Sequence, residues 1–439
     1  MTQPDKGKLH FRCPNAPVFI NQAKDVIIMY MPKTKILKFP AGFLWGASTS
    51  AYQVEGGNVN DWSAWEKSEK RIRQLKKAGK NPEDYICGRA CDSYNRYGED
   101  FDLAVKLNNN AHKLGIEWSR IEPEPGKWNM KEVEHYRRVL QALKKRNLKV
   151  FVCLWHWANP LWLAQMGGWA NKQSVFYFSR YAKLMAAELG DLVDYWLTLN
   201  EPMAHIGFGY IRGNFPPARP ADIFGAIKVY KNLTKTHIAG YQAIHEILPQ
   251  AKVGFISLTD FFEPANKYNP LDWILTVAAR YLHHRAFLNK AKKYLDFIGV
   301  DYYFHNRLSV WPPFKINVNT KVNEMGWEIY PAGIEQVIKY MSCLNIPIFI
   351  TENGIADADD NQRAEFIIEH LKYIYQAIGE GANVQGYSHW SLLDNFEWAE
   401  GWWPKFGLYA VDRKTFKRTA RESAKVYAQI CKNNEVRVD

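Results

Sequence analysis

The sequence contains the stretch Ile348-Phe349-Ile350-Thr351-Glu352-Asn353-Gly354, in which strand-favouring residues run into a glutamate and Asn-Gly then breaks the strand. A second stretch, Trp196-Leu197-Thr198-Leu199-Asn200-Glu201-Pro202, has the same order of apolar run, glutamate and breaker. If both strands belong to one closed barrel, the two glutamates face each other across its open end. Two opposed carboxyl groups are suited to the hydrolysis of a glycosidic bond. The two stretches therefore predict that chemistry.

Around these two stretches, apolar runs alternate with amphipathic helical stretches. Eight runs predict strands, at Leu44–Ala47, Ala111–Trp118, Leu148–Trp155, Leu192–Leu199, Ala251–Leu258, Phe297–Tyr303, Pro347–Thr351 and Val384–Trp390. Helical periodicity is found in 94–107, 130–146, 173–189, 222–247, 332–344, 361–379 and 418–432. Strands that alternate with helices favour a parallel sheet, and eight of them predict a single α/β domain, a (β/α)8 TIM barrel.

No linker rich in Pro, Gly or Ser divides this pattern, so residues 36–439 are predicted to form one catalytic barrel. Residues 1–35 form an N-terminal extension without a clear period. Within it, Val26–Met31 fits either an edge strand or a segment packed on the barrel. A Lys/Arg-rich stretch, 66–90, is predicted to be an exposed loop.

The composition excludes several classes of protein. No apolar run approaches the roughly 20 residues that span a bilayer. The start, MTQPDKGKLHF, lacks the apolar core of a signal peptide, so we expect a cytoplasmic protein without a membrane partner. The six cysteines do not resemble a disulfide framework, and Cys87 and Cys91 have no second Cys/His pair near them. No metal and no cofactor are therefore expected.

The formal net charge of +12 raises nucleic acid as a partner. The basic residues, however, are interleaved with apolar ones along helical segments such as 137–146, which is typical of solvated helix faces. Nucleic-acid binding is therefore not predicted. The 17 tryptophans are more informative, because flat apolar rings stack on sugar faces, although many of them will serve as core residues.

Polar and aromatic residues follow the predicted strands at the ends where a barrel of this kind carries its chemistry. They are Gln53, Trp118-Ser119-Arg120, Trp155-His156-Trp157, Asn200-Glu201, Tyr302-Tyr303, Glu352 and Trp390. Seven of the eight strand ends contribute to this set, which predicts a functional site at that end of the barrel.

Five motifs in this order resemble the signatures of glycoside hydrolase family 1, the β-glucosidase and β-galactosidase family. They are QVEG (53–56), LWHWANP (154–160), TLNEP (198–202), ITENG (350–354) and WSLLDNFEW (390–398), and the resemblance covers roughly 38–432. It implies a retaining exo-β-glycosidase that acts on β-glucosides, with galactosides and fucosides tolerated. The implied partner is a β-glycoside or a short oligosaccharide, and a homo-oligomer stays open.

The resemblance also implies roles for individual residues. Glu352 matches the nucleophile, Glu201 the acid/base, and Arg120 and Tyr303 match side chains that contact the nucleophile. The residues implied to bind the sugar are Gln53, His156, Trp157, Asn200, Trp390, Glu397 and Trp398. Trp327 matches an aromatic platform for the leaving group, and Phe406 is counted with the substrate-binding residues.

Three departures from the family pattern stand out. Asp301 replaces the Asn that usually precedes the paired tyrosines, which adds a negative charge near the site. The segment 258–297 looks shorter than usual, which would leave the site more open. Trp402-Trp403-Pro404-Lys405-Phe406 stands where the family often has Tyr-Ser-Lys-Arg-Phe, which indicates either an apolar aglycone or a covered edge.

Two alternative functions fit the sequence less well than this one. The 6-phospho-β-glycosidase branch of the family resembles a site with Ser in place of Glu397, and with Lys and Tyr near 404 and 406. Here the carboxylate of Glu397 would repel a 6-phosphate, and Pro404 cannot bind one. A carbohydrate-binding relative without hydrolytic activity would lack one catalytic glutamate, whereas both are present. Transglycosylation uses the same residues as hydrolysis, so the sequence leaves it open.

Overall fold

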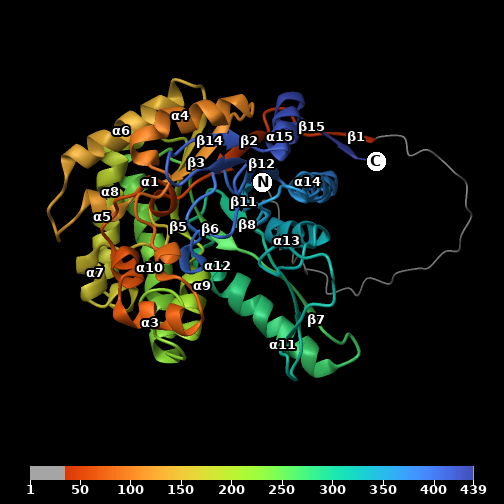
Figure 1. The fold of residues 1–439 in the computed structure, drawn as a ribbon. Helices are drawn as coiled ribbons and strands as arrows, with labels where there is room; N and C mark the ends of the chain where they lie inside the picture. Colours follow the sequence, from red (N-terminus) through yellow and green to blue (C-terminus); the bar gives the residue numbers. More distant parts are fainter. Residues whose placement is uncertain (1–34, 439) are drawn as a thin grey trace, which may run out of the picture.

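Eight parallel strands form a closed barrel in the computed structural model, which describes residues 35–438 (Figure 1). The order around the barrel is β11-β12-β2-β3-β4-β5-β6-β8. The strands span Leu44–Ser48 (β2), Ala111–Gly115 (β3), Lys149–Cys153 (β4), Tyr195–Asn200 (β5), Val253–Leu258 (β6), Ile298–Asp301 (β8), Ile348–Asn353 (β11) and Val384–His389 (β12). All eight predicted strands are present, and the (β/α)8 barrel is confirmed.

The helices surround the barrel in the order that the periodicity predicts (Figure 1). The long ones are Ser93–Lys106 (α4), Met130–Lys144 (α6), Ser174–Leu189 (α8), Ile223–Ile247 (α10), Ala332–Ser342 (α13), Arg363–Gly379 (α14) and Glu422–Asn433 (α15). The last helix begins later than predicted, because Arg418–Ala420 (β14) pairs with Tyr409–Val411 (β13). Between β6 and β8, the chain forms β7 (Phe261–Pro264), α11 (Pro270–Arg280), a π-helical turn (Tyr281–Arg285) and α12 (Ala286–Ala291).

Aromatic side chains fill the barrel interior. The rings of Phe151, Tyr195 and Phe297 each pack against Phe349, with centroids 5.0 to 5.4 Å apart. Together with Leu197 and Ile256 they form a closed apolar cluster. Phe349 stands three residues before Glu352 on β11, so this packing fixes the strand that carries the glutamate.

Residues 1–34 of the N-terminal extension lie outside the described residues, and so does the predicted segment Val26–Met31. The first described strand, Lys35–Lys38 (β1), pairs antiparallel with the last, Glu435–Val438 (β15). The prediction that 66–90 is a loop is wrong in part: Glu69–Lys77 forms helix α3, whose first turn is capped by the hydroxyl of Ser68. Along 35–438, no helix is both long enough and apolar enough to cross a membrane.

Candidate active site

Glu201 and Glu352, which are distant in the chain, meet at the carboxyl-terminal end of the barrel. Glu352 is the fifth residue of β11. Glu201 follows β5 in a left-handed conformation with φ of 44°, and Pro202 then starts the short helix α9 (Pro202–Ile206). Each glutamate is only 4% exposed. One carboxyl oxygen of each, together with one of Asp301, lie within 4.8 Å of one another.

The carboxylate of Glu352 is held from two sides. The ammonium of Lys113, on β3, donates to Oε1 of Glu352 and to Oδ1 of Asn200, the latter at 2.9 Å. The phenol of Tyr303 donates to Oε2 of Glu352 at 2.9 Å. Burial lowers the pKa of Lys113, but the negative charges of Glu352 and Asp301 outweigh burial and raise it overall. Lys113 therefore stays cationic beside Glu352.

The expectation that Arg120 contacts Glu352 is wrong. Its Nε donates to Oε2 of Glu55 at 3.0 Å and its Nη2 to the carbonyl of Gly56 at 2.6 Å. Its guanidinium lies 4.3 Å from the centre of the Tyr94 ring. The physical reason is that β3 ends at Gly115 and Trp118–Ile121 form the short helix α5, so the chain has left the sheet before it reaches Arg120.

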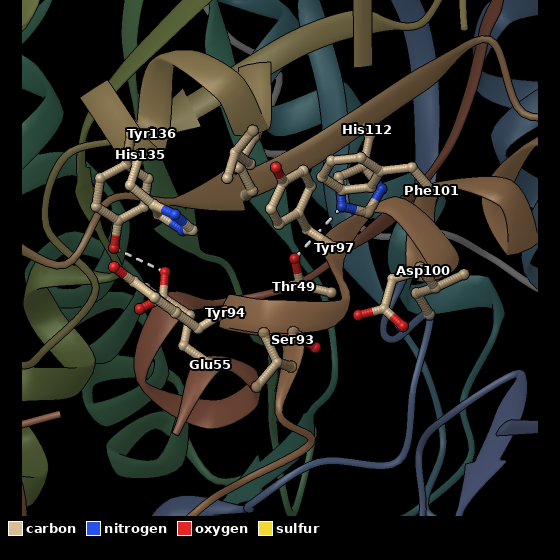
Figure 2. A pocket seen from close by; sticks show the side chains of 16 residues that line it. Thr49, Glu55, Ser93, Tyr94, Tyr97, Asp100, Phe101, His112, His135 and Tyr136 are labelled. Atoms are coloured by element: carbon tan, nitrogen blue, oxygen red, sulfur yellow. Dashed lines mark hydrogen bonds between the residues drawn. The ribbon is translucent and has the colours of Figure 1, made fainter. Parts of the chain in front are cut away.

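Arg120 instead pairs with Glu55, which belongs to a second polar cluster beside the barrel. Figure 2 shows Glu55 in this cluster. Glu55 and the stacked Tyr94 line a cavity of about 40 Å³. There the phenol of Tyr136 donates to Oε1 of Glu55 at 2.7 Å, as the dashed line in Figure 2 marks. Ligand sites usually enclose roughly 300 Å³ or more. This cavity is too small for a sugar, and the cluster braces the loop that follows Glu55.

Asp301, at the end of β8, adds a third carboxyl group to the pair. Its Oδ1 accepts a hydrogen bond from the hydroxyl of Thr351 at 2.6 Å, and one of its carboxyl oxygens lies within 4.8 Å of one of Glu201. Burial, followed by the charges of Asp301 and Glu352, raises the pKa of Glu201 well above its ordinary value. The three carboxyl groups are close enough to share a cation, and the ammonium of Lys113 already supplies one.

Three of the residues predicted to bind sugar carry a buried polar atom that has no hydrogen-bond partner within residues 35–438. These atoms are Nδ2 of Asn200, Nδ1 of His156 and Oε2 of Glu397. Burial lowers the pKa of His156 well below its ordinary value, and the cation Lys113 adds to this, so the imidazole is neutral. Burial, with the charges of Glu352 and Glu400, raises the pKa of Glu397 to about 8. Unpaired buried polar groups are costly unless a ligand satisfies them.

Gln53 differs from these three because its amide is already engaged. Its Oε1 accepts from the hydroxyl of Ser50 at 2.6 Å, and its Nε2 donates to Oδ1 of Asn395 and to the carbonyl of Phe396. It is fully buried. A sugar hydroxyl would therefore share Gln53 with these partners.

The predicted aromatic residues form two groups. In the first, Trp398 packs against His156, with centroids 5.6 Å apart, and against Trp157 at 4.9 Å, while Trp390 lies 6.2 Å from His156. The indole of Trp157 also donates to the carbonyl of Asn200 at 3.1 Å, which ties this group to the β5 end.

In the second aromatic group, Trp327 and Phe406 lie 6.0 Å apart, and each is within 6.4 Å of Tyr303, the residue bound to Glu352. The two neighbouring tryptophans, Trp402 and Trp403, differ in exposure. Trp402 is buried and donates to the carbonyl of Ile86, so it covers an edge, whereas Trp403 is 43% exposed.

Sequence reasoning missed Lys113. The signal was a charged residue inside the apolar run 111–118, where an inward-facing side chain has to be paired. Lys113 is 1% exposed, and its partner Glu352 is buried as well. The pairing could have been suspected from sequence, but its partner could not.

Replacing Lys113 by Met is expected to lower the free energy of unfolding by about 3–5 kcal/mol, because it leaves a buried carboxylate without its cation. Denaturant unfolding measures this change. Lys149→Met on the neighbouring strand is the matched control, since Lys149 is exposed where it pairs with Asp194 at 2.9 Å. The Lys149→Met variant should lose less than about 1 kcal/mol of the free energy of unfolding. Equal losses in the two variants would contradict a buried pair at Lys113.

Comparisons with known proteins agree with one another. The sequence model of glycosyl hydrolase family 1 matches residues 36–293 and 281–436. A 1,4-beta-D-glucan glucohydrolase of Thermotoga neapolitana is 33% identical over 445 residues, which cover 90% of this chain and 99% of the relative. The structure of a beta-glycosidase from Pyrococcus horikoshii is similar with a TM-score of 0.83 at 36% identity, over 92% of this chain and 96% of that one. The structure of a family 1 β-glucosidase from Thermotoga maritima is similar with a TM-score of 0.83 at 30% identity, over 91% of this chain and 99% of that one.

Proposed function

The chain belongs to glycosyl hydrolase family 1, and on this basis we propose that Glu352 is the nucleophile and Glu201 the acid/base of a retaining β-glycosidase. The observation that carries the proposal is the distance between the two glutamates, whose nearest carboxyl oxygens lie within 4.8 Å. Retaining enzymes keep the two carboxyl groups about 5–5.5 Å apart, whereas inverting enzymes need roughly 6.5–9.5 Å to admit a water. The spacing supports direct attack by Glu352.

In the first step, Glu352 attacks the anomeric carbon while Glu201 donates its proton to the leaving oxygen. Lys113 and Tyr303 each hold one oxygen of Glu352, which orients the carboxylate for attack. The raised pKa of Glu201 keeps a proton available for the aglycone.

In the second step, the glycosyl ester is hydrolysed. Formation of the ester removes the negative charge of Glu352, and that charge is one of the causes that raise the pKa of Glu201. The pKa of Glu201 therefore falls in the intermediate, and the group becomes a base that deprotonates the attacking water. Release of the sugar restores the negative charge of Glu352, and Glu201 keeps the proton taken from the water and is neutral again.

Recognition of the sugar is assigned to the polar atoms that lack a partner. Nδ2 of Asn200 can donate to the 2-hydroxyl, whose hydrogen bonds strengthen in the transition state. The neutral His156 and the carboxyl of Glu397 can each satisfy further hydroxyls, and Gln53 joins them by sharing its amide. Trp327 and Phe406 are proposed to contact the aglycone because they adjoin Tyr303.

The substrate class that we propose is β-glucosides, with β-galactosides and β-fucosides tolerated. The relatives are consistent with this range, since a beta-glucosidase A of Thermotoga maritima is 32% identical over 91% of this chain. A 6-phosphate is disfavoured, because the charges closest to Glu397 are those of Glu352 and Glu400. A cytoplasmic location stays a prediction from the sequence, and the sequence leaves a homo-oligomer open.

A panel of nitrophenyl glycosides tests this function. We expect turnover of the β-glucoside, β-galactoside and β-fucoside, and only background rates with the α-glucoside and the 6-phospho-β-glucoside. Proton NMR should show the β anomer of the sugar forming first, because two displacements restore the configuration. Release of the α anomer first would contradict the retaining mechanism, and a preference for the phosphorylated substrate would favour the 6-phospho alternative.

A further inference from the structure

Asp301 is a carboxyl group that the two-glutamate mechanism does not use. It lies at the end of β8, fully buried, in register with Glu352 on the neighbouring strand. One of its carboxyl oxygens lies within 4.8 Å of one of Glu201, and its Oδ1 accepts from the hydroxyl of Thr351. Its Oδ2 is buried and has no hydrogen-bond partner within residues 35–438. Two neighbouring carboxyl groups can form a hydrogen bond with each other when one of them carries a proton, and Oδ2 of Asp301 is available as its acceptor.

The charges of this cluster also favour one retained proton. Three carboxyl groups meet within 4.8 Å and Lys113 is the cation paired with them, so full ionisation would leave a net charge of −2 in a buried site. One proton reduces this to −1. Because like charges at such distances oppose ionisation, one carboxyl group is held neutral.

We propose that Asp301 is a positioning residue that holds the catalytic proton on Glu201 and extends the alkaline range of the reaction. The inference rests on the proposed function, since it assumes that Glu201 is the acid. The hydroxyl of Thr351 stabilises the anion of Asp301, whereas Glu352 is engaged by Lys113 and Tyr303. The proton shared by Asp301 and Glu201 therefore resides on Glu201, with Asp301 as its acceptor.

The directions of the pKa shifts agree with this assignment. Burial raises the pKa of both groups, but the hydrogen bond between them raises that of Glu201 and lowers that of Asp301. The other titratable or charged groups that face the cluster are Glu352, Lys113, Tyr303, His156, Cys153 and Glu397.

Most of these neighbours keep one charge state over the working range of pH. Burial raises the pKa of Tyr303 well above its ordinary value and that of the Cys153 thiol to about 12, so both stay neutral. His156 is neutral because burial lowers its pKa, and Lys113 stays charged. Glu397, whose pKa is raised to about 8, is the neighbour that also titrates, and the test therefore compares variants rather than relying on one profile.

Replacing Asp301 by Asn removes the negative charge and places an amide donor beside Glu201. The pKa of Glu201 should fall, so its proton is lost at lower pH. We expect the basic limb of kcat/KM for a substrate with a poor leaving group to move down by about 1 pH unit or more. Asp301→Ala, which removes the charge without adding a donor, should move the limb in the same direction by less.

Asp260→Asn is the matched control. Asp260 is another buried aspartate, 7% exposed, and its hydrogen-bond donor is the amide of Asn306 at 2.7 Å rather than Glu201. The basic limb of kcat/KM for the Asp260→Asn variant should match that of the wild type. An unchanged limb in folded Asp301→Asn, or equal shifts in Asp301→Asn and Asp260→Asn, would overturn the proposal.

A measurement on the wild-type protein keeps the proposal testable if the Asp301 variants fail to fold. Infrared difference spectra between wild type and Glu201→Gln at neutral pH should contain the carbonyl stretch of a protonated carboxyl group, and its absence would overturn the inference. Failure of the proposed function is distinguishable: in that case Glu201→Ala loses its dependence on the leaving group, whatever the Asp301 variants do.

Discussion

Glutamine in place of Glu352 is expected to lower kcat on aryl β-glucosides by about 10⁴-fold or more, because an amide does not form the covalent glycosyl ester. The substitution preserves the size of the side chain, so Tyr303 retains an oxygen or nitrogen to contact. Steady-state rates with a dinitrophenyl β-glucoside measure the loss, and thermal unfolding shows that the barrel remains intact.

The control for this variant is Glu122→Gln. Glu122 is a fully buried glutamate that pairs with Arg180, outside the cluster formed by Glu201, Asp301 and Glu352. Its turnover should remain close to that of the wild type. A large loss there would show that any buried glutamate is required for the fold, and the effect at Glu352 would lose its meaning.

Covalent trapping gives an independent check of Glu352. A 2-deoxy-2-fluoro-β-glucoside with a good leaving group should leave a stable glycosyl ester, and mass spectrometry of peptides should find the label within 348–354. A label on Asp301 or Glu201 would refute Glu352 as the nucleophile.

Alanine in place of Glu201 should affect substrates unequally. With a poor leaving group, loss of the acid should slow the reaction by about 10²–10⁴-fold. With a dinitrophenyl leaving group, the first step needs no proton, so the glycosyl-enzyme should accumulate and give a burst of product. The measurement is kcat/KM across aryl glucosides of different leaving-group pKa, and equal losses across that series would argue against Glu201 as the acid.

Azide provides the matching rescue experiment for Glu201→Ala. The shortened side chain leaves space beside the ester on Glu352, and a small anion that needs no base can attack there. We expect faster turnover of the accumulated intermediate and a β-glycosyl azide as product. Rescue of Glu352→Gln under the same conditions with the same product would instead exchange the two roles.

The fold was predictable because local pattern and global architecture agree. Each barrel strand overlaps one of the predicted runs, and β12, predicted as Val384–Trp390, differs by one residue from Val384–His389. The stretch 66–90 was harder to interpret, because helix α3 there is short and mostly charged. Its apolar face consists of Ile72 and the buried Leu75, which is too narrow a pattern to mark a helix clearly.

The site was predictable to the extent that residues follow strand ends. Tyr303 and Asn200 lie beside Glu352 and its cation, as the motifs indicated. Arg120 was placed wrongly because the apolar run continues to Trp118 in sequence, whereas the hydrogen-bonded strand stops at Gly115. Lys113 was missed because a lone lysine in a strand gives no sign of which face it occupies.

The sequence by itself determined the barrel, the two glutamates and the strand ends that carry them, because each of these depends on residues that are neighbours in the chain. Tertiary structure alone decided which cation serves Glu352 and which carboxyl group contacts Glu201. Lys113, Asp301 and Glu352 come from three different strands. Their contacts depend on the register and closure of the sheet, and the energy of a buried charge depends on everything packed around it.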